Sequence, residues 1–457
     1  MAADSRLPNW FPRLTRPGPP HPAQVIVIAF TGVLIIGTAL LMLPISKQGP
    51  GGTGFTDALF HAASAVCVTG LSSVDTATHW TGFGQAVLLL LVQIGGIGIM
   101  TFASILGLVV ARRLGLRARL QTAHESNVVD QGDLRRVLWG VARISFSVEL
   151  VVAAALTLRW WLGYEYGLGE ALWLGVFHSV AAFNNAGFSL WSDSLMGFAT
   201  DPWVCLPVAG AVIVGGLGFP VLLELRRELR HSLHWTLNTK TVIAATVVLL
   251  ALSTVFVTAV EWSNPKTLGA LDPPARLLAG FFQAVMPRSA GFNTVSIGDL
   301  HPTTWFGMDI LMFIGGSPAS TAGGIKVTTF AVIVFIVLSE IRGGGAVNMF
   351  GKRLPRSAQR QAITVVALTS FVIAVAAMVL MLLENFELDH ALFEVTSAFT
   401  TTGLTTGVTP ELGTASKLLM VFLMFAGRLG PITLASAIAL RRSDRLYQYP
   451  KERPIIG

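Results

Sequence analysis

The segments VCVTGLSS (66–73), FNNAGFSL (183–190), PRSAGFNT (287–294) and FTTTGLTT (399–406) share one pattern, and this pattern decides the fold. In each, an apolar run leads to a glycine, after which come a polar stretch and a long apolar run with further glycines. The four glycines stand 117, 104 and 112 residues apart, and they are Gly70, Gly187, Gly291 and Gly403. A phenylalanine lies ten residues before each, at Phe60, Phe177, Phe281 and Phe393. This recurrence indicates four copies of one structural unit.

The composition is that of a polytopic membrane protein. Of the 457 residues, 53% are hydrophobic and only 12% charged, whereas a soluble domain carries about a quarter charged residues. The two cysteines, Cys67 and Cys205, form no CxxC pair, so neither a structural metal site nor a disulfide framework is expected. The basic, proline-rich stretch 1–22 lacks a cleavage motif, and we interpret it as a retained cytoplasmic lead. The net charge of +7 lies in loops between apolar runs, which argues against nucleic acid as a partner.

Eight apolar stretches are long enough to cross a bilayer, which takes about 20 residues. They form pairs, at 23–44 with 84–111, 134–162 with 203–223, 237–260 with 304–340, and 360–383 with 415–440. One glycine segment lies inside each pair, and its apolar part is too short to span. We interpret it as a re-entrant half-helix followed by a loop. Non-helical backbone at membrane depth is tolerated only inside protein or beside water, so the four loops are expected to surround a pore.

The predicted fold class is an all-α polytopic membrane protein with eight transmembrane helices and four re-entrant pore helices around a pseudo-four-fold axis. The copies run in the same direction, which excludes inverted repeats. The expected divisions are a lead at 1–22, repeats at 23–111, 134–223, 237–340 (with a broken second helix) and 360–440, and a cytoplasmic tail at 441–457. Most basic residues lie before, between and after the repeats, so both termini are expected in the cytoplasm. Acidic residues on the opposite face would concentrate cations, although each one is equally well explained as part of an ordinary solvated rim.

Glycine suits a filter that strips water from an ion, because main-chain carbonyls must point inward in conformations that glycine adopts without steric cost. The expected filter carbonyls belong to three residues in each repeat: Val68, Thr69, Gly70, Asn185, Ala186, Gly187, Ser289, Ala290, Gly291, Thr401, Thr402 and Gly403. Neutral carbonyls without a carboxylate ring suit a monovalent cation such as potassium. With one central glycine per loop, the filter is expected to be short and its selectivity looser.

A second set of glycines follows each loop glycine by 24–29 residues: Gly95-Gly96, Gly215-Gly216, Gly315-Gly316 and Gly427-Arg428. We interpret most of them as sites of close helix packing. Two departures stand out. In the third repeat the span is interrupted by Gly315, Gly316, Ser317, Pro318, Ala319, Ser320, Thr321, Ala322, Gly323, Gly324, Ile325 and Lys326, which cannot form a continuous helix. In the fourth, Arg428 replaces a glycine. Together they predict a gate just inside the filter, against the alternative that Arg428 makes a structural ion pair or helix-carbonyl contact.

Other polar residues within the spans include Gln93, Arg143, Glu149 and Asp309. Arg143 and Glu149 share one predicted helix and are interpreted as structural, paired with each other or with neighbours. His61 and His178 follow the repeat phenylalanines, but they fall in different repeats without a carboxylate at ligand spacing, so no metal site is predicted. Arg288, three residues before Gly291, either ties down its loop or pairs with an acid.

The four single-glycine loops, the GGSPASTAGGIK break (315–326) and the FAGRLGP span (425–431) resemble the Ktr/Trk/HKT superfamily of potassium transporters. The resemblance covers 23–457. Only eight spans are visible, and with the ending YPKERPIIG this is most similar to the KtrB-type subunits of that superfamily.

The resemblance implies an activity that composition does not reveal. Such members are homodimers in the bacterial inner (plasma) membrane with one pore per subunit, and they carry potassium inward, often promoted by sodium. A cytosolic KtrA/TrkA-type RCK ring that binds ATP or ADP gates the pore. By motif, the filter glycines correspond to Gly70, Gly187, Gly291 and Gly403, the gating loop to 315–326, and the gate-linked arginine to Arg428. The chain has no nucleotide motif of its own, so no organic cofactor is expected, and nucleotide control would come from the partner.

Three alternatives remain open from the sequence. One is a less selective potassium and sodium channel on the same scaffold. An intramembrane enzyme is disfavoured, because neither HExxH nor GxSxG occurs. A proton-coupled transporter would need a carboxylate or histidine relay at mid-membrane, for which Glu149 alone is thin support.

Overall fold

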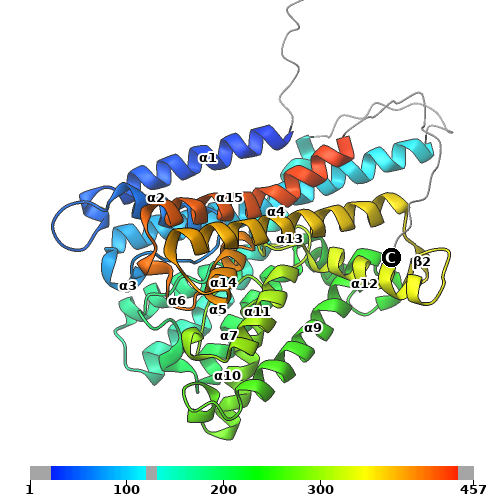
Figure 1. Cartoon of the computed structure of the whole chain (residues 1–457). Helices are drawn as coiled ribbons and strands as arrows, with labels where there is room; N and C mark the ends of the chain where they lie inside the picture. Colours follow the sequence, from blue (N-terminus) through cyan, green and yellow to red (C-terminus); the bar gives the residue numbers. More distant parts are fainter. Residues whose placement is uncertain (1–21, 120–130, 441–457) are drawn as a thin grey trace, which may run out of the picture.

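The structure, a computed structural model, describes residues 22–119 and 131–440. In these ranges its regular secondary structure consists of helices and one pair of two-residue strands, joined by loops (Figure 1). The expected cytoplasmic tail at 441–457 and residues 1–21 of the expected lead lie outside the described residues.

The helices repeat in the same order in each quarter of the chain. The first helix of each quarter is long: α1 (Pro22–Leu41), α5 (Gln131–Gly163), α9 (Leu237–Glu261) and α13 (Arg356–Glu384). A short helix follows: α2 (Phe55–Val66), α6 (Leu168–Phe183), α10 (Pro273–Val285) and α14 (Leu388–Phe399). The quarter ends with α4 (Gly82–Arg119), with α7 (Pro202–Leu217) and α8 (Phe219–Glu228), with α11 (Pro302–Ile314) and α12 (Val327–Ile341), or with α15 (Thr414–Leu440).

The remaining elements are short connections. They are α3 (Thr76–His79), η1 (Pro44–Ser46), η2 (Met196–Phe198), η3 (Ser232–His234), η4 (Leu268–Ala270), η5 (Ile297–Asp299), η6 (Thr409–Glu411) and the antiparallel strands β1 (Asn348–Met349) and β2 (Lys352–Arg353).

The four short helices cannot cross a bilayer by themselves. They hold 12, 16, 13 and 12 residues. At 1.5 Å per residue, their lengths are about 18–24 Å, against about 30 Å of hydrocarbon. Each is followed within four residues by backbone with positive φ, which a helix cannot accommodate.

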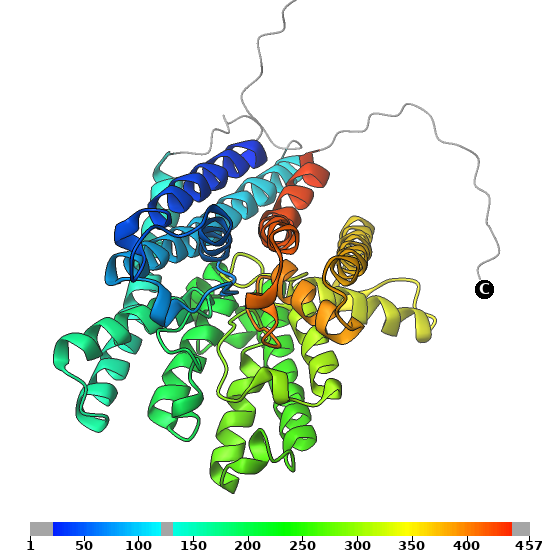
Figure 2. The ribbon, with the colours of Figure 1, turned by 60° about the vertical axis from the view of Figure 1, so that its left-hand side comes forward.

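The short helices pack in a closed cycle. Each contacts the first helix of its own quarter, and each also contacts a late helix of the quarter before it. These cross-quarter pairs are α6 with α4, α10 with α7, α14 with α11, and α2 with α15. The last pair joins the first quarter to the fourth. The chain therefore closes into a ring around the loops that follow the short helices, as Figure 2 shows from blue to red.

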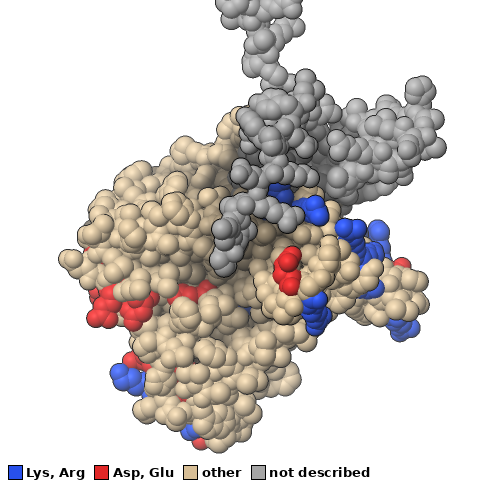
Figure 3. Space-filling model, turned by 45° about the vertical axis from the view of Figure 1, so that its right-hand side comes forward, with Lys and Arg blue, Asp and Glu red and all other residues tan. Residues whose placement is uncertain are grey.

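Four helices have the length and apolarity of membrane spans, namely the described parts 82–104 of α4 and 137–163 of α5, with the whole of α9 and α13. The α7–α8 pair gives a fifth, and Ile26–Leu41 and α12 are apolar but shorter. This is fewer than the eight predicted spans. Two of those, 203–223 and 304–340, are each divided into two helices, and the number refers to the described residues. On the face in Figure 3, basic side chains gather mainly at one end and acidic ones mainly at the other, with an uncharged band between them.

The predicted continuous span at 203–223 is wrong. Helix α7 stops at Leu217, and α8 starts at Phe219 after a turn of 99°. Gly218 at the junction has φ +83°, and Pro220 has no N–H with which to continue the hydrogen bonds of α7. At the start of α8 the same proline is tolerated, because its N–H would have no helical partner there.

Candidate functional site

The four loop glycines form a closed ring of backbone contacts. A methyl group placed on any one of them would lie 2.7 Å or less from the carbonyl oxygen of the residue before another glycine. The pairs are Gly70 with Ala186, Gly187 with Ala290, Gly291 with Thr402, and Gly403 with Thr69. The four segments therefore approach one another too closely for any side chain at the glycine position.

The four segments also share one backbone conformation. Each glycine has positive φ, at +91°, +68°, +76° and +90° in chain order. The residue two positions earlier has positive φ as well: Val68 (+55°), Asn185 (+61°), Ser289 (+74°) and Thr401 (+51°). This conformation is costly for a non-glycine residue, above all for the β-branched Val68 and Thr401, and it persists only where the surroundings impose it.

Hydrogen bonds impose this conformation unequally. Six residues before the glycine, Ser64 and Ser397 accept the N–H of Gly70 and Gly403 through their hydroxyls, each at 3.0 Å. The equivalent residues in the second and third quarters are Ala181 and Val285, whose side chains cannot accept a hydrogen bond. The first and fourth segments thus have an anchor that the other two lack.

In three quarters, a side chain of the short helix also bonds the N–H three residues after the glycine. His178 Nε2 pairs with the N–H of Leu190 at 3.3 Å, and Gln283 Oε1 accepts from Thr294 at 3.4 Å. Glu394 Oε1 accepts from the Thr406 N–H at 2.8 Å. We call these three side chains the loop staples.

Glu394 is the most heavily bonded of the staples. It is fully buried, and it also accepts the hydroxyls of Thr405 (2.7 Å), Thr406 (3.1 Å) and Thr409 (2.6 Å). All of these donors are neutral. A negative charge at Glu394 is therefore spread over hydrogen bonds rather than paired with a cation among the described residues.

In the first quarter, two side chains of the short helix, Asp57 and His61, bond the segment that follows Gly70. Asp57 Oδ1 accepts the hydroxyl of Ser73 (2.8 Å) and the ammonium group of Lys417 (2.8 Å), which joins α2 to α15. Burial raises the pKa of Asp57, but the bonds from Lys417 and Ser73 outweigh it and lower the pKa below its ordinary value. His61 pairs with the carbonyls of Asp57 and Val74 at 3.1 and 3.2 Å. A neutral imidazole carries one N–H, so His61 donates to one of these two carbonyls. His178 has both ring nitrogens bonded, to the Leu174 carbonyl and the Ser189 hydroxyl, and protein groups account for the placement of both histidines.

Residues 315–326, which we call the central loop, join α11 to α12 and touch three of the four glycine segments. The Gly323 N–H donates to Ser289 Oγ at 2.8 Å, and Ser289 Oγ donates to the Thr401 carbonyl at 2.7 Å. The Asn185 amide, in the orientation that satisfies both of its polar atoms, donates to Thr321 Oγ1 at 3.3 Å. The loop is thus hydrogen-bonded to Asn185 and Ser289, each of which lies two residues before a loop glycine.

The same loop packs into the bend between α7 and α8. The Ser317 N–H donates to the Gly216 carbonyl (3.0 Å), and its hydroxyl donates to the Leu217 carbonyl (2.6 Å). In return, the Phe219 N–H donates to the Ala319 carbonyl at 3.1 Å. A methyl on Gly218 would lie 2.7 Å from the Pro318 carbonyl. The bend therefore supplies the backbone groups that hold the loop, a contact that the sequence analysis missed although Gly218-Phe219-Pro220 is a helix-breaking signal.

Two cationic side chains hold loop carbonyls. Arg428 is buried, and its Nη1 donates to the Thr321 carbonyl, while its Nε and Nη2 have no hydrogen-bond partner among the described residues. Lys326 Nζ donates to the Ala322 carbonyl at 2.5 Å. Among the described residues, neither cation forms an ion pair. The structure thus shows Arg428 bonded to a carbonyl of the central loop, and whether it acts in a gate or as a structural contact stays a prediction.

The second glycine set packs against the short helices. A methyl on Gly95, Gly215 or Gly427 would overlap the carbonyl of Val66, Phe183 or Phe399, respectively. Each of these carbonyls belongs to the residue four before the loop glycine, so the packing is equivalent in three quarters. In the third quarter, a methyl on Gly315 would instead overlap the Gly323 carbonyl, inside the central loop.

The other predicted polar residues are resolved as follows. Glu149 accepts from Gln93 Nε2 (3.0 Å to each oxygen) and Asn184 Nδ2 (3.3 Å), and not from Arg143, whose side chain is exposed. Arg288 donates to the Thr246 hydroxyl at 3.2 Å rather than to an acid. Asp309 is buried, and its Oδ1 has no hydrogen-bond partner among the described residues.

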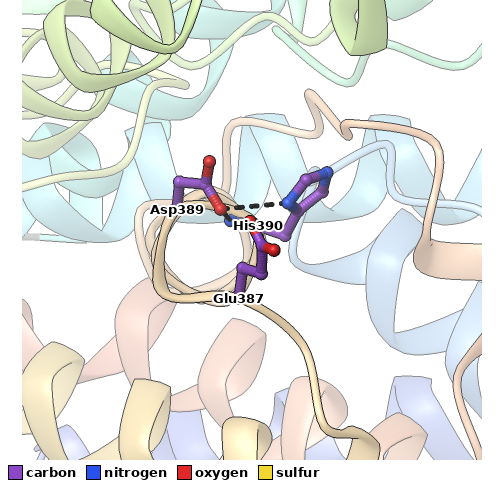
Figure 4. A group of neighbouring side chains, drawn as sticks. All are labelled: Glu387, Asp389 and His390. Atoms are coloured by element: carbon purple, nitrogen blue, oxygen red, sulfur yellow. Dashed lines mark hydrogen bonds and ion pairs between the residues drawn. The ribbon is translucent and has the colours of Figure 1, made fainter.

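Glu387, Asp389 and His390 lie together at the start of α14 (Figure 4). Asp389 Oδ1 accepts from the backbone N–H of His390 (2.8 Å) and pairs with its Nδ1 (3.0 Å). The imidazole also packs edge-on against Trp305. These contacts explain the cluster as local bonding at a helix end, and we assign no metal to it.

Comparison with known proteins identifies the family. Residues 11–449 match the family described as "TrkH: Cation transport protein". The chain belongs to the TrkH family of cation transport proteins. The resemblance drawn from the glycine loops and the 315–326 break is therefore confirmed.

Three relatives align over most of their length. "Ktr system potassium uptake protein B" of Bacillus subtilis is 40% identical, covering 95% of this chain and 97% of the relative. The protein of the same name from Vibrio alginolyticus is 38% identical, with 95% and 94% covered. "Potassium/sodium uptake protein NtpJ" of Enterococcus hirae is 32% identical, with 95% and 97% covered. Since these relatives are named as uptake proteins, the prediction of a transporter rather than an enzyme is confirmed.

A solved structure shares the fold. The crystal structure of the potassium transporter TrkH from Vibrio parahaemolyticus superposes with a TM-score of 0.75 at 17% identity, covering 93% of this chain and 86% of that one. With its apolar helices and this family's fold, the chain is a multi-pass membrane protein.

Proposed function

We propose that this chain forms a potassium uptake pathway in which the four glycine segments are the selectivity filter. The observation that carries the proposal is the closed ring Gly70–Gly187–Gly291–Gly403, with positive φ at each glycine and at the residue two before it. Conformations of opposite hand that alternate along a short segment turn its successive carbonyls to one side, the arrangement that replaces the water around an ion. The four repeats, with the short helices as pore helices, are part of the proposal.

The ring is chemically suited to a monovalent cation. The twelve proposed filter residues include no Asp or Glu, so an ion would meet neutral carbonyls. The buried carboxylate of Glu394 lies behind the ring and is already bonded to threonines. The two Ktr relatives are named for potassium uptake, and this supports potassium as the cargo.

We infer that the central loop is the gate. It is bonded to the second and third glycine segments, lies against the Thr400 carbonyl of the fourth, and is held by Arg428 through the Thr321 carbonyl. Four of its residues, Gly315, Ala319, Gly324 and Lys326, have positive φ, a strained conformation for the two that are not glycine. Because the loop is held by individual hydrogen bonds rather than by a continuous helix, it can leave the path without unfolding the ring of helices around it.

The remaining parts of the proposal rest on the family. We propose a homodimer in the bacterial inner membrane, with both termini cytoplasmic, gated by a cytosolic nucleotide-binding ring of the RCK type and promoted by sodium. The chain's GxGxxG run, at 49–54, lies between the helices α1 and α2 rather than between a strand and a helix, so it is no nucleotide-binding motif. Adding ATP or ADP to the purified chain alone should therefore leave its flux unchanged, whereas a response would contradict a separate regulatory subunit.

The decisive experiment measures potassium and sodium flux into proteoliposomes for the wild type, Gly291→Ser and Gly210→Ser. A side chain at Gly291 meets the Thr402 carbonyl and sits at φ +76°, whereas one at Gly210 meets nothing within 4 Å. We expect the wild type and Gly210→Ser to prefer potassium and Gly291→Ser to lose that preference. An unchanged preference in Gly291→Ser would contradict the filter.

A closed gate could silence all three proteins, so ion binding supplies a second readout. Potassium should raise the unfolding temperature of the wild type more than sodium does, and Gly291→Ser should lose the difference. The Enterococcus relative is named for both potassium and sodium. Equal stabilisation of the wild type by the two ions would therefore favour the alternative of a less selective monovalent cation channel.

A further inference from the structure

A groove of about 500 Å³ lies between α5 and α8, away from the glycine ring. Its charged lining residues are all basic: Arg135 and Arg143 from α5 and Arg226 from α8. The rest of the lining is apolar or aromatic and consists of Trp139, Gly140, Ile144 and Leu223. The three arginines are exposed, and among the described residues none of them has an ion-pair partner. The groove therefore offers cationic donors beside an apolar wall.

The bend at Gly218 creates this groove. Helix α7 packs along α5, but α8 leaves the line of α7 by 99°. The ring of Phe219, at the start of α8, lies against Gly140 of α5, where a methyl group would approach it to 2.8 Å. Beyond this contact α8 diverges from α5, and the side chains of Arg135 and Trp139 remain exposed. The groove is thus a consequence of the same break that holds the central loop.

The position of the groove relative to the membrane follows from two contacts between α5 and the α7–α8 pair. Arg159 of α5 and Asp201, at the start of α7, form an ion pair at 2.7 Å. The Gly140–Phe219 contact lies 19 residues away along α5 and 18 residues away along α7 and α8. At 1.5 Å per residue both intervals are about 28 Å, close to the hydrocarbon thickness of about 30 Å. If Arg159 and Asp201 mark one boundary of the membrane, the groove lies at the other.

We propose that this groove binds the phosphate headgroup of an anionic phospholipid, with the acyl chains along the apolar wall. Arginines at a membrane boundary donate to phosphate oxygens in a geometry that matches their planar fork. The exposed Trp139 is placed as interfacial tryptophans are, with its ring in the headgroup region. The apolar wall favours a lipid over a soluble anion, because a free phosphate would gain nothing from Ile144 and Leu223. Basic pockets between helices at this depth are a known form of headgroup site.

The test compares phospholipid retention by the detergent-purified full chain, using native mass spectrometry. The probes are phosphatidylglycerol and phosphatidylcholine with identical acyl chains. The triple variant Arg135→Gln/Arg143→Gln/Arg226→Gln removes the groove charges. The triple variant Arg230→Gln/Arg342→Gln/Arg353→Gln removes the same net charge from exposed positions outside the groove.

We expect the wild type and the control triple variant to retain phosphatidylglycerol in preference to phosphatidylcholine. The groove triple variant should lose the preference. An arginine at the membrane surface is worth about fivefold in affinity for an anionic lipid, so the three together should weaken retention by roughly a hundredfold. Arg143→Lys keeps the charge and should retain most of the preference, and it guards against a groove variant that fails to fold.

Three results would overturn the proposal. Equal retention of both lipids by the wild type would show that the groove does not select an anionic headgroup. Displacement of phosphatidylglycerol by inorganic phosphate at matched concentration would indicate a small-anion site instead. A groove triple variant that still prefers phosphatidylglycerol as strongly as the control triple variant does would show that the three arginines do not hold the headgroup.

Discussion

Replacing Glu394 tests whether the loop staples set ion selectivity. Glu394→Ala removes the acceptor of the Thr406 N–H. The hydroxyls of Thr405 and Thr409 already lie 2.9 Å apart and can bond each other, so the groups that lose their partner are the amide and the hydroxyl of Thr406, and the amide has the shorter bond to lose. A buried unpaired amide costs about 1–3 kcal/mol, and 1.4 kcal/mol corresponds to a factor of ten. We therefore expect the preference for potassium over sodium to fall about tenfold.

Glu394→Gln separates the hydrogen bond from the charge. The amide oxygen of glutamine can still accept from Thr406, as Gln283 accepts from Thr294 in the third quarter. The glutamine variant should therefore keep its preference within about threefold of the wild type, well inside the cost of one unpaired amide. Gln283→Ala serves as the matched truncation, and its effect should be smaller, because its bond is longer at 3.4 Å than the 2.8 Å bond of Glu394.

The assay is the ratio of potassium to sodium flux in proteoliposomes, with the thermal unfolding temperature of each variant as a check on folding. A Glu394→Ala protein with the wild-type ratio would refute the role of the staple. If Glu394→Gln loses as much selectivity as Glu394→Ala, the negative charge rather than the bond to Thr406 is what matters.

Four further outcomes are expected. Arg428→Gln removes the charged donor to the Thr321 carbonyl and should raise flux about tenfold without changing ion preference; unchanged flux would remove Arg428 from the gate. Ser289→Ala deletes both the acceptor of the Gly323 N–H and the donor to the Thr401 carbonyl, so flux and preference should both change in the same measurements. Gly427→Ala overlaps the Phe399 carbonyl and should lower the free energy of unfolding by about 1–3 kcal/mol, whereas Gly32→Ala, with nothing nearby, should not. The lowered pKa of Asp57 means that its bonds stabilise the protein above its ordinary pKa of 3.8 and are lost as pH falls through the folded-state pKa. Asp57→Asn should therefore lose about 1 kcal/mol less of its free energy of unfolding than the wild type does when the pH falls below 3.8, as measured by unfolding at several pH values.

The features that could be predicted from the sequence are those set by the backbone preferences of the residues at that place in the chain. Gly70, Gly187, Gly291 and Gly403 were identifiable because each combines a helix-ending signal with a fixed position in a repeat. The run of glycines with Pro318 predicted that a helix could not continue through 315–326, and α11 does stop at Ile314. In each case the signal is a backbone preference of the residue itself, and such preferences are visible without a structure.

Features that depend on a distant partner were not predictable in this way. The bend at Gly218 was missed because apolar character alone favoured one span over 203–223. The groups that stabilise the bend by hydrogen bonding belong to the central loop, 100 residues away in the chain. The positive φ of Val68 and Thr401 was missed because β-branched residues oppose it locally. Surrounding helices impose it, so only the assembled ring reveals it.

The unequal anchoring of the four segments links the proposed filter to the proposed gate. Serine hydroxyls hold the first and fourth segments from their own short helices, through Ser64 and Ser397. The second and third segments lack this anchor. Instead, Asn185 in the second segment and Ser289 in the third each form a hydrogen bond with the central loop. The loop thus supplies to these two segments a bond that the other two obtain internally. If the loop moves to open the path, half of the filter loses a support while the other half keeps its own. A pore built this way would couple opening to a loosening of the filter on one side, and the fixed pair of segments would preserve the ring while ions pass.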